Sequence, residues 1–484
     1  MAHYNEFKLF AQRVGLIGLI NLLTSLSGVL LIPILTKTLS IEEFGIWAQI
    51  MVTIGLIPSI VMLGLPYTMV RFLAVAKKKE DIQEDFYSIA SLVLVTSAIV
   101  SILSFLFAKS LAILLFDNNI LVTKMLSLII FIECLNSLML NFFRTFQQIR
   151  KYALFTFSMT CLNFLLVSYF VLSDQGIIGA IIGVLAARCL IFLIMTLIII
   201  RMIGFKIPEF RNIWDYLAFG LPTVPGNLSS WVVTSSDRYV IGILLGTAYV
   251  GYYSPGYTLG NVIQILAGPL ILILPPVLSK YYDENNIEAV KTVLRYSFKY
   301  FLLFAIPSAF GISLLSKPML VILSTPDIAS KGYMVTPFVA FSSVFFGATV
   351  VISQIIILEK RTVITGIIYM VAAIFNFVLN MILVPHMGIT GAAFTTLIAY
   401  LLLFALGTYY SFRYLRFDIC PEFILKSILA SIAMSLVIFM WNPEGWLSIL
   451  VIVWVCAIVY VVTLLLFKGI SRKEIEFFRG LIQV

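Results

Sequence analysis

Four ionisable side chains stand inside long apolar stretches of this sequence, where charged residues are otherwise rare. They are Glu133, Arg188, Asp237 and Arg238. Ionisable groups at membrane depth are costly, and they usually face a cavity or a partner of opposite charge. An arginine keeps its charge and presents a fork of donors that matches phosphate oxygens. The chemistry open to these residues is therefore anion binding, ion binding or structural ion pairing.

Two of these residues, Asp237 and Arg238, are consecutive. Adjacent helical residues point about 100° apart and do not face each other, so we expect no pairing between them. At least one of the two then needs a partner on another helix. For Glu133 and Asp237 two alternatives stand: each pairs with an intramembrane arginine, or each binds a coupling proton or sodium ion.

Two further arginines, Arg71 and Arg144, end apolar stretches of the sequence. They either receive an anionic group of a ligand or anchor helix ends at the cytoplasmic surface, as basic residues commonly do.

The elements that carry these charges have the composition of membrane-spanning helices. Of 484 residues, 61% are hydrophobic and only 11% are charged, against roughly 25% charged in soluble domains. We predict an all-α integral membrane protein with about fourteen transmembrane helices, since apolar runs of about 20 residues recur along the chain. The predicted spans are 14–36, 47–72, 86–108, 120–143, 154–173, 177–201, 216–245, 254–279, 296–316, 334–358, 363–384, 388–412, 423–441 and 446–467.

The distribution of basic residues orients these spans. Most of the 32 Lys and Arg residues fall in every second loop, which the positive-inside rule places in the cytoplasm. The asymmetry persists to the end of the chain and predicts an even number of spans with both termini cytoplasmic. The net charge of +9 follows from this topology and does not indicate binding to nucleic acid.

Short motifs recur in the second half of the chain in the same order. The turn around Gly45 matches the turn around Gly251, and GIIGA at 176–180 matches GITGA at 388–392. Six spans separate the equivalents, so the repeats are parallel and related by an axis along the membrane normal. We predict a six-helix lobe over 1–205, a second six-helix lobe over 206–415, and two additional transmembrane helices with a cytoplasmic tail over 416–484.

Prolines and glycines interrupt two of the predicted spans. Proline removes a backbone donor and kinks a helix, and such breaks are tolerated where neighbours or a cavity satisfy the backbone. The breaks are either static bends or hinges for alternating access. The candidate hinge residues are Pro222, Pro225, Gly226, Pro275 and Pro276.

The residue types needed for metal or nucleotide chemistry are scarce. His3 and His386 are the only histidines, and the five cysteines are scattered and odd in number. The sequence has no phosphate-binding loop and no loop long enough for a catalytic domain. We expect no metal, no cofactor and no enzymatic activity, so the energy for transport comes from a proton or sodium gradient or from consumption of product outside.

Four segments together suggest a family. They are Phe44-Gly45, Gly64-Leu65-Pro66 with Arg71, Ser236–Tyr239 leading into Leu245–Tyr253, and Pro276–Ser279. They resemble the polysaccharide-transporter branch of the MOP superfamily, which includes Wzx-type O-antigen flippases and related teichoic-acid and sporulation proteins. The resemblance covers essentially the whole chain, including the number of spans.

The resemblance implies two six-helix lobes forming a V that alternates access. It implies a flippase moving a polyprenyl-diphosphate-linked oligosaccharide, the precursor of an O-antigen, capsule, teichoic acid or similar glycan, across the cytoplasmic membrane. Arg188 and Arg238 would then line the cavity and bind the diphosphate, after Arg71 and Arg144 receive it. Besides membrane lipids, a glycan polymerase and glycosyltransferases are candidate partners.

Four tyrosines cluster at the outer ends of two predicted spans: Tyr249, Tyr252, Tyr253 and Tyr257. They form either an interfacial tyrosine belt or a sugar-stacking surface at the exit of the cavity.

The main alternative is a sodium- or proton-coupled multidrug or metabolite exporter of the same superfamily, which usually has twelve spans. The additional pair of spans and the intramembrane arginines favour an anionic, lipid-linked substrate instead. A major facilitator transporter normally has a glycine in the loop at 76–81, where this chain has none. A membrane glycan polymerase typically keeps a large outer loop, which this sequence lacks.

Overall fold

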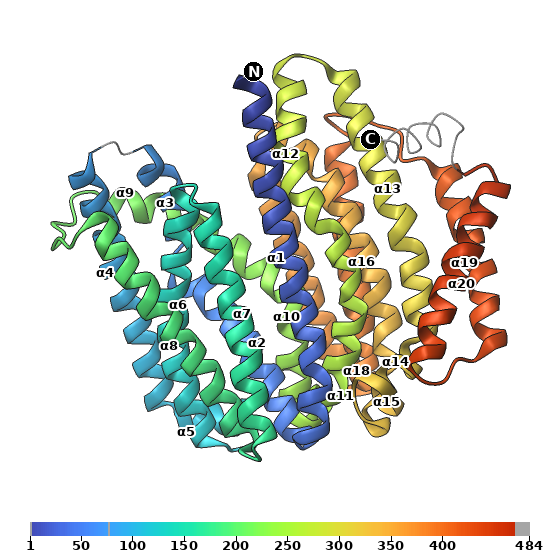
Figure 1. Cartoon of the computed structure of the whole chain (residues 1–484), viewed down its shortest axis with the longest axis horizontal. Helices are drawn as coiled ribbons and strands as arrows, with labels where there is room; N and C mark the ends of the chain where they lie inside the picture. Colours follow the sequence, from blue (N-terminus) through green and yellow to red (C-terminus); the bar gives the residue numbers. More distant parts are fainter. Residues whose placement is uncertain (1, 76–77, 470–484) are drawn as a thin grey trace. The chain divides into compact units, whose positions relative to one another are not determined.

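The computed structural model of the chain describes residues 2–75 and 78–469, with side chains from 15 to 74 and from 78 to 469 (Figure 1). All regular secondary structure within these ranges is helical, which confirms the predicted all-α class. The predicted cytoplasmic tail beyond residue 469 lies outside the described residues.

The chain divides by close packing into two compact units. Unit 1 comprises Met1–Ser254 and Tyr369–Ala392, and unit 2 comprises Pro255–Ile368 and Ala393–Val484. The helices α11 (Thr247–Asn261) and α18 (Thr362–Ser411) contain residues of both units. The predicted division at 205 and 415 follows the sequence repeats rather than this packing, and it stays a prediction.

The remaining helices belong to one unit each. Those of unit 1 are α1 (Ala2–Thr38), α2 (Ile41–Val61), α3 (Leu65–Phe72), η1 (Leu73–Val75), α4 (Lys79–Leu106), α5 (Ala108–Leu115), α6 (Ile120–Thr145), α7 (Ile149–Leu172), α8 (Gly176–Ile203), α9 (Ile213–Gly220), η2 (Leu221–Thr223) and α10 (Val224–Leu245). Those of unit 2 are η3 (Val262–Ala267), α12 (Gly268–Asp283), α13 (Ile287–Leu314), α14 (Ser316–Leu323), α15 (Pro326–Gly332), α16 (Val335–Ile352), α17 (Gln354–Leu358), α19 (Pro421–Trp441) and α20 (Trp446–Leu466).

Twelve helical stretches among the described residues are long and apolar enough to cross a membrane, so the chain is a multi-pass membrane protein. One of them, α18, breaks at Gly388, whose φ of 60° and ψ of −144° are not helical. Helix α10 has 22 residues but is not among the twelve. The predicted count of fourteen requires α10 and both parts of α18 to span the membrane, and it stays a prediction.

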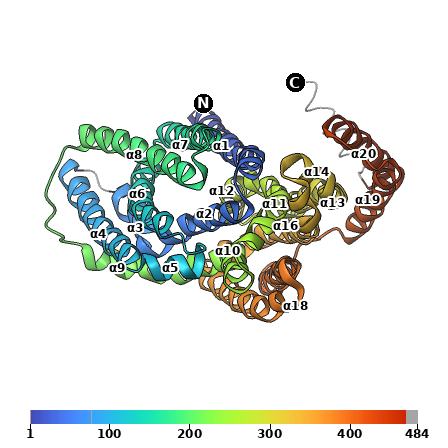
Figure 2. The same ribbon diagram turned by 90° about the horizontal axis from the view of Figure 1, so that it is seen from below.

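Helix α6 lies at the centre of unit 1. It contacts α2, α3, α4, α7 and α8, and Figure 2 shows these helices arranged around it. Leu138, Phe142 and Phe143 on α6 are buried in the core of the unit. Because α6 is so largely enclosed by protein, polar side chains on it can face neighbouring helices or an internal space instead of lipid.

Two glycines that the sequence repeat equates lie in one close contact within unit 1. A Cβ on Gly45 would stand 1.9 Å from the carbonyl oxygen of Thr247, and a Cβ on Gly251 would stand 2.5 Å from that of Ile41. Thr247 is the repeat equivalent of Ile41, so the contact is reciprocal, as a two-fold relation between the repeats requires. Only glycine lets the backbones of α2 and α11 approach this closely.

Helix α13 packs against most of the long helices of unit 2. It contacts α12, α16 and α19, and α19 packs on α20. The Tyr460 hydroxyl of α20 donates to the carbonyl oxygen of Leu303 at 3.0 Å and lies 2.9 Å from the Ser427 hydroxyl of α19. The two additional helices of the prediction are therefore attached to α13 by a buried tyrosine.

Candidate functional site

Two helix breaks in unit 1 pack against each other. The first separates α2 from α3 at Gly64, whose φ is 73°, and the second is the turn η2 between α9 and α10. A Cβ on Gly64 would stand 2.0 Å from the carbonyl oxygen of Gly220. Pro222 lies in η2 and Pro225 in the first turn of α10, so the helix is interrupted where the sequence indicates. The hinge role of these residues stays a prediction.

A cavity of about 390 Å³ lies beside these breaks, entirely within unit 1. Its wall comes from α2 and its turn into α3, from α6 and from α10, and polar groups are frequent in it. These include Ser137, Asn141 and Arg144 of α6, Asn227, Ser230 and Thr234 of α10, and the aromatic residues Tyr67 and Trp231. We refer to it as the polar cavity.

One face of α6 carries a row of polar residues that leads into this cavity. Glu133, Ser137, Asn141 and Arg144 recur at spacings of three and four, so they lie on the same side of the helix. The row extends about 16 Å along α6 at 1.5 Å per residue. Arg144 stands exposed in the last turn and has no ion pair or side-chain hydrogen bond with any described residue.

An ion pair between α6 and α8 lies at the other end of this row. Arg188 Nε donates to Glu133 Oε2 at 2.6 Å, and their side chains are 9% and 17% exposed. Asn136 Nδ2 donates to the carbonyl oxygen of Arg188 at 3.0 Å and fixes the backbone there. No partner of the two Nη groups of Arg188 occurs among the described residues, so the guanidinium keeps donors for another anion.

The prediction that Asp237 and Arg238 do not pair is wrong. Arg238 Nη1 lies 3.3 Å from Asp237 Oδ1, because the long arginine side chain folds back although the two Cβ directions diverge. Asp237 also accepts the backbone N–H of Arg238 at 2.9 Å and the hydroxyl of Tyr253. The Arg238 guanidinium lies 5.8 Å from the centre of the Tyr253 ring, and all three residues are buried.

Polar residues of α18 lie beside this network. The Ser236 hydroxyl donates to Asn376 Oδ1 at 3.5 Å, and Asn380 Nδ2 donates to the same oxygen at 3.1 Å. Both asparagines are buried. Buried polar groups of α10 and α18 are thus in contact within unit 1.

A seam of hydrogen bonds holds α2 against α10 next to the polar cavity. Trp231 Nε1 donates to the carbonyl oxygen of Val52 at 3.3 Å, and the hydroxyls of Thr53 and Tyr239 lie 2.5 Å apart. Farther along, Gln49 Nε2 donates to the carbonyl oxygen of Arg238 at 3.4 Å. Together with the Gly45–Gly251 contact, this seam closes α2 on its neighbours beyond the cavity.

Of the four arginines predicted to bind substrate, only Arg144 lines the polar cavity. Arg188 is in its ion pair, Arg238 in the buried network, and Arg71 at the exposed end of α3. Their roles in binding stay predictions. The remaining hinge candidates Pro275 and Pro276 lie inside α12 of unit 2, and Gly226 lies in the first turn of α10.

Sequence reasoning missed Ser137, Asn141, Asn227 and Trp231 as site residues. For Ser137 and Asn141 the sequence contained a usable pattern, because their spacing from Glu133 and Arg144 places all four on one face of α6. The two α10 residues join the site only because α10 packs on α2, which no local pattern predicts.

Three of the four clustered tyrosines fit neither of the two predicted roles, and for Tyr249 both roles stay predictions. Tyr252, Tyr253 and Tyr257 are buried, and only Tyr249 is well exposed. A buried ring can neither anchor at a membrane interface nor stack on a sugar. Tyr253 instead donates its hydroxyl to Asp237.

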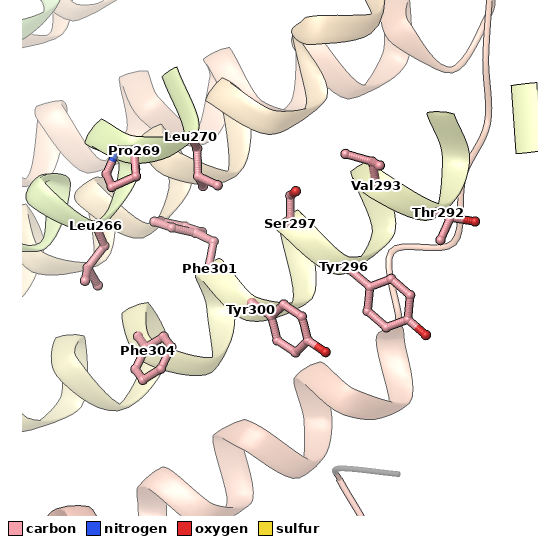
Figure 3. Close-up of a pocket in the computed structure, with 10 residues that line it drawn as sticks. All are labelled: Leu266, Pro269, Leu270, Thr292, Val293, Tyr296, Ser297, Tyr300, Phe301 and Phe304. Atoms are coloured by element: carbon pink, nitrogen blue, oxygen red, sulfur yellow. The ribbon is translucent and has the colours of Figure 1, made fainter. Parts of the chain in front are cut away.

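A second cavity lies in unit 2 and has a different character (Figure 3). It measures about 460 Å³ and lies between α13 on one side and η3 with α12 on the other. Leu266, Leu270, Phe301 and Phe304 line it, no charged residue does, and the rings of Tyr296 and Tyr300 stack at 5.7 Å beside it. We refer to it as the apolar groove.

Within the described residues no three His, Cys, Asp or Glu side chains form a group that could hold a metal ion. The five cysteines are free.

Comparison with protein families gives two matches. The profile of the family described as Polysaccharide biosynthesis protein matches residues 10–282, which is more than half of the chain. The profile of the MatE family matches residues 222–382.

Two curated relatives come from Haloferax volcanii. "Probable low-salt glycan biosynthesis flippase Agl15" is 22% identical over 238 residues, which are 48% of this chain and 49% of that protein. "Probable flippase AglR" is 26% identical over 175 residues, 35% of each chain. The chain thus spans about a third to a half of the length of the curated relatives it matches.

Two solved structures show the fold. The lipid II flippase MurJ in an inward closed conformation matches with a TM-score of 0.77 and 20% identity, over 98% of this chain and 99% of that one. An inward-facing multidrug resistance MATE family transporter of the MOP superfamily matches with a TM-score of 0.69 and 16% identity, over 81% and 94%.

Proposed function

Because the chain belongs to the polysaccharide biosynthesis protein family of the MOP superfamily, we propose that it is a flippase for a lipid-linked glycan. It moves a polyprenyl-diphosphate-linked oligosaccharide, the precursor of an O-antigen, capsule, teichoic acid or similar glycan, across the cytoplasmic membrane by alternating access. It is a transporter and not an enzyme. Both termini face the cytoplasm, and a polymerase or glycosyltransferases act on the same lipid-linked glycan.

The observation that carries this proposal is the polar cavity among membrane-spanning helices. A polar wall inside the bilayer is expensive unless it is satisfied by protein, water or cargo. Hydroxyls, amides and an arginine without an acidic partner suit a cargo that is both hydrogen-bonding and anionic. A sugar diphosphate has both properties, and the names of the curated relatives support the same class of cargo.

In this proposal Arg144 contacts the diphosphate in the cavity, and Arg188 offers a second cationic position farther along the polar face of α6. Glu133 orients Arg188 through its Nε and leaves the Nη groups to the cargo. Arg71 attracts the headgroup to the cytoplasmic side. Arg238 is the predicted ligand that the geometry supports least, because its guanidinium is engaged with Asp237 and Tyr253.

Energy coupling through Asp237 is part of the proposal. Its carboxylate is buried, and buried carboxylates of membrane proteins commonly serve as proton or ion sites. Asp237→Asn should transport at one rate with or without an imposed proton or sodium gradient, whereas the wild type responds to one of them. A variant that keeps the full gradient response would exclude Asp237 as the coupling residue.

Cells that lack this protein test the proposal. They should accumulate lipid-linked oligosaccharide that stays on the cytoplasmic face, out of reach of an external glycosidase. Wild type and Arg150→Gln should restore export, whereas Arg144→Gln should not. Arg150 is an exposed arginine at the start of α7, so it controls for simple loss of cytoplasmic charge. Normal export by the deletion strain would exclude the proposed function.

One observation supports the alternative function of an exporter, namely the match of the MatE family profile to residues 222–382. Such an exporter would carry small organic ions, and an organic cation would meet the unpaired Arg144 in the cavity. Ethidium efflux from cells that produce the protein separates the two functions, because only the exporter would lower dye accumulation.

A further inference from the structure

The polar cavity holds more neutral hydrogen-bonding groups than a diphosphate alone would use. Phosphate oxygens accept hydrogen bonds and do not donate them at neutral pH. A cavity for phosphate alone therefore needs donors only. The groups left open in this cavity include an acceptor as well as donors.

Two asparagines on facing helices show this mixture. Asn141 Nδ2 donates to the carbonyl oxygen of Ser137 at 2.8 Å, which turns its Oδ1 acceptor to the other side. Asn227 Oδ1 accepts the Tyr67 hydroxyl at 3.1 Å, which leaves its Nδ2 as the open donor. Neither open group has a partner within the described part of the chain. One acceptor and one donor group therefore remain in the same space.

An aromatic ring stands in the same wall. Trp231 lines the cavity, and its Nε1 is held by the carbonyl oxygen of Val52 at 3.3 Å. The Tyr239 ring, at 5.6 Å, packs against it. The indole therefore has a fixed orientation, and a fixed aromatic surface next to donors and acceptors is suited to a ring that is apolar on one face and hydroxylated at its edge.

From these contacts we infer that the polar cavity is a sugar subsite, a conclusion that rests on the proposed function. It takes the uncharged pyranose ring that is joined to the diphosphate. Asn141 accepts from one ring hydroxyl, Asn227 donates to another oxygen, and Trp231 covers one face. Arg144 lies three residues beyond Asn141, about 5 Å along the axis of α6, which is the spacing of a sugar ring from its own phosphate.

If the cavity is a sugar subsite, the protein should bind a glycosylated lipid more tightly than the same lipid without its sugar, and both affinities can be measured. The protein in lipid nanodiscs is titrated with two probes, a polyprenyl diphosphate and the same lipid carrying one N-acetylglucosamine. The wild type should bind the glycosylated lipid roughly tenfold more tightly, the effect of one or two hydrogen bonds with stacking. Asn141→Leu and Asn227→Leu should lose most of that advantage and keep the affinity for the bare diphosphate.

Controls separate this loss from damage to the fold. Asn163→Leu makes the same change at a residue of α7 that does not line the polar cavity, and it should keep the advantage. Arg144→Gln should weaken both probes to a similar degree. Elution as a single species with an unchanged melting temperature identifies the variants that are intact.

Two results overturn the inference in distinguishable ways. Equal affinity of the wild type for both probes, or an unchanged sugar advantage in both asparagine variants, excludes the sugar subsite and leaves the proposed function standing. Binding of neither probe by the wild type excludes the proposed function, and the subsite with it.

Discussion

The two cavities of this protein differ in what their walls are made of, although both lie among membrane-spanning helices and their volumes are similar. The polar cavity of unit 1 combines hydroxyls, amides, Trp231 and an exposed arginine. The apolar groove of unit 2 is lined by leucine, phenylalanine and tyrosine side chains and by no charge. Size alone therefore does not separate a cargo site from a surface that lipid can fill.

The two cavities differ in which surrounding molecules their walls can contact favourably. An apolar wall is satisfied by lipid chains at no cost, so the groove needs no further explanation. A polar wall must find partners, and each group without one costs free energy. The polar side chains that line the polar cavity are satisfied by water or by a polar ligand, and they are therefore the stronger evidence for a ligand site.

A bulky side chain placed in each cavity should have the largest effect on glycan transport, and it should show which of the two cavities holds the cargo. Ser137→Trp places a large ring in the polar cavity and should reduce glycan transport by about 100-fold or more, since the cargo is excluded. Ser297 of α13 lines the apolar groove (Figure 3), and Ser297→Trp should reduce glycan transport by about threefold or less. Export of glycan by complemented cells, at matched protein abundance, measures both, and equal losses would contradict the distinction.

The glycine contact between α2 and α11 gives the next largest effect. Gly45→Val brings a side chain against the Thr247 carbonyl oxygen and should destabilise the contact by about 1–3 kcal/mol. Probe binding at the polar cavity should change because α2 forms part of its wall, whereas the groove is built from other helices. Thermal unfolding and lipid-probe binding together check this, and an unchanged melting temperature would mean that the glycines are not packed as described.

The ion pair of Glu133 and Arg188 should have an intermediate effect with a diagnostic pattern. Each single glutamine variant leaves one charge of a largely buried pair without its partner. The stability losses of the two single variants should therefore add up to more than the loss in the double variant, by a coupling of about 1–3 kcal/mol. If Arg188 also binds cargo, the double variant regains stability but not transport. Recovery of both would assign the pair a structural role only.

The smallest effect is expected at Gly226. Nothing lies within 4 Å of a Cβ placed there, so Gly226→Ala should be tolerated and should stabilise α10 by up to about 1 kcal/mol. A slower transport rate in a more stable protein would support the predicted hinge. An unchanged rate would make this break a static bend.

The sequence allowed the class of fold to be predicted because long apolar runs have few alternatives to membrane-spanning helices. It also located the break at Pro222, since proline acts through the backbone itself. The exact number of spans is harder, because α10 is long but polar and α18 runs through its turn at Gly388.

The site was only partly predictable for a related reason. Charges such as Glu133 and Arg188 are conspicuous against an apolar background, and the pairing of one with the other was among the predicted alternatives. Neutral residues such as Asn141 and Asn227 can be recognised as site residues only when the helices that they face are known. Those contacts are set by tertiary packing. The pairing of Asp237 with Arg238 escaped prediction because a flexible side chain can fold back where the helical geometry suggests divergence.

Reconstituted flipping is the measurement on which the interpretation most depends. Liposomes are prepared with polyprenyl-diphosphate-linked N-acetylglucosamine in both leaflets, and a membrane-impermeant galactosyltransferase labels the sugars that reach the outside. Wild type and Arg150→Gln should allow nearly all of the lipid to be labelled, whereas Arg144→Gln should leave the inner half unlabelled. Labelling that stops at the outer half with the wild type, or goes to completion with Arg144→Gln, would contradict the account.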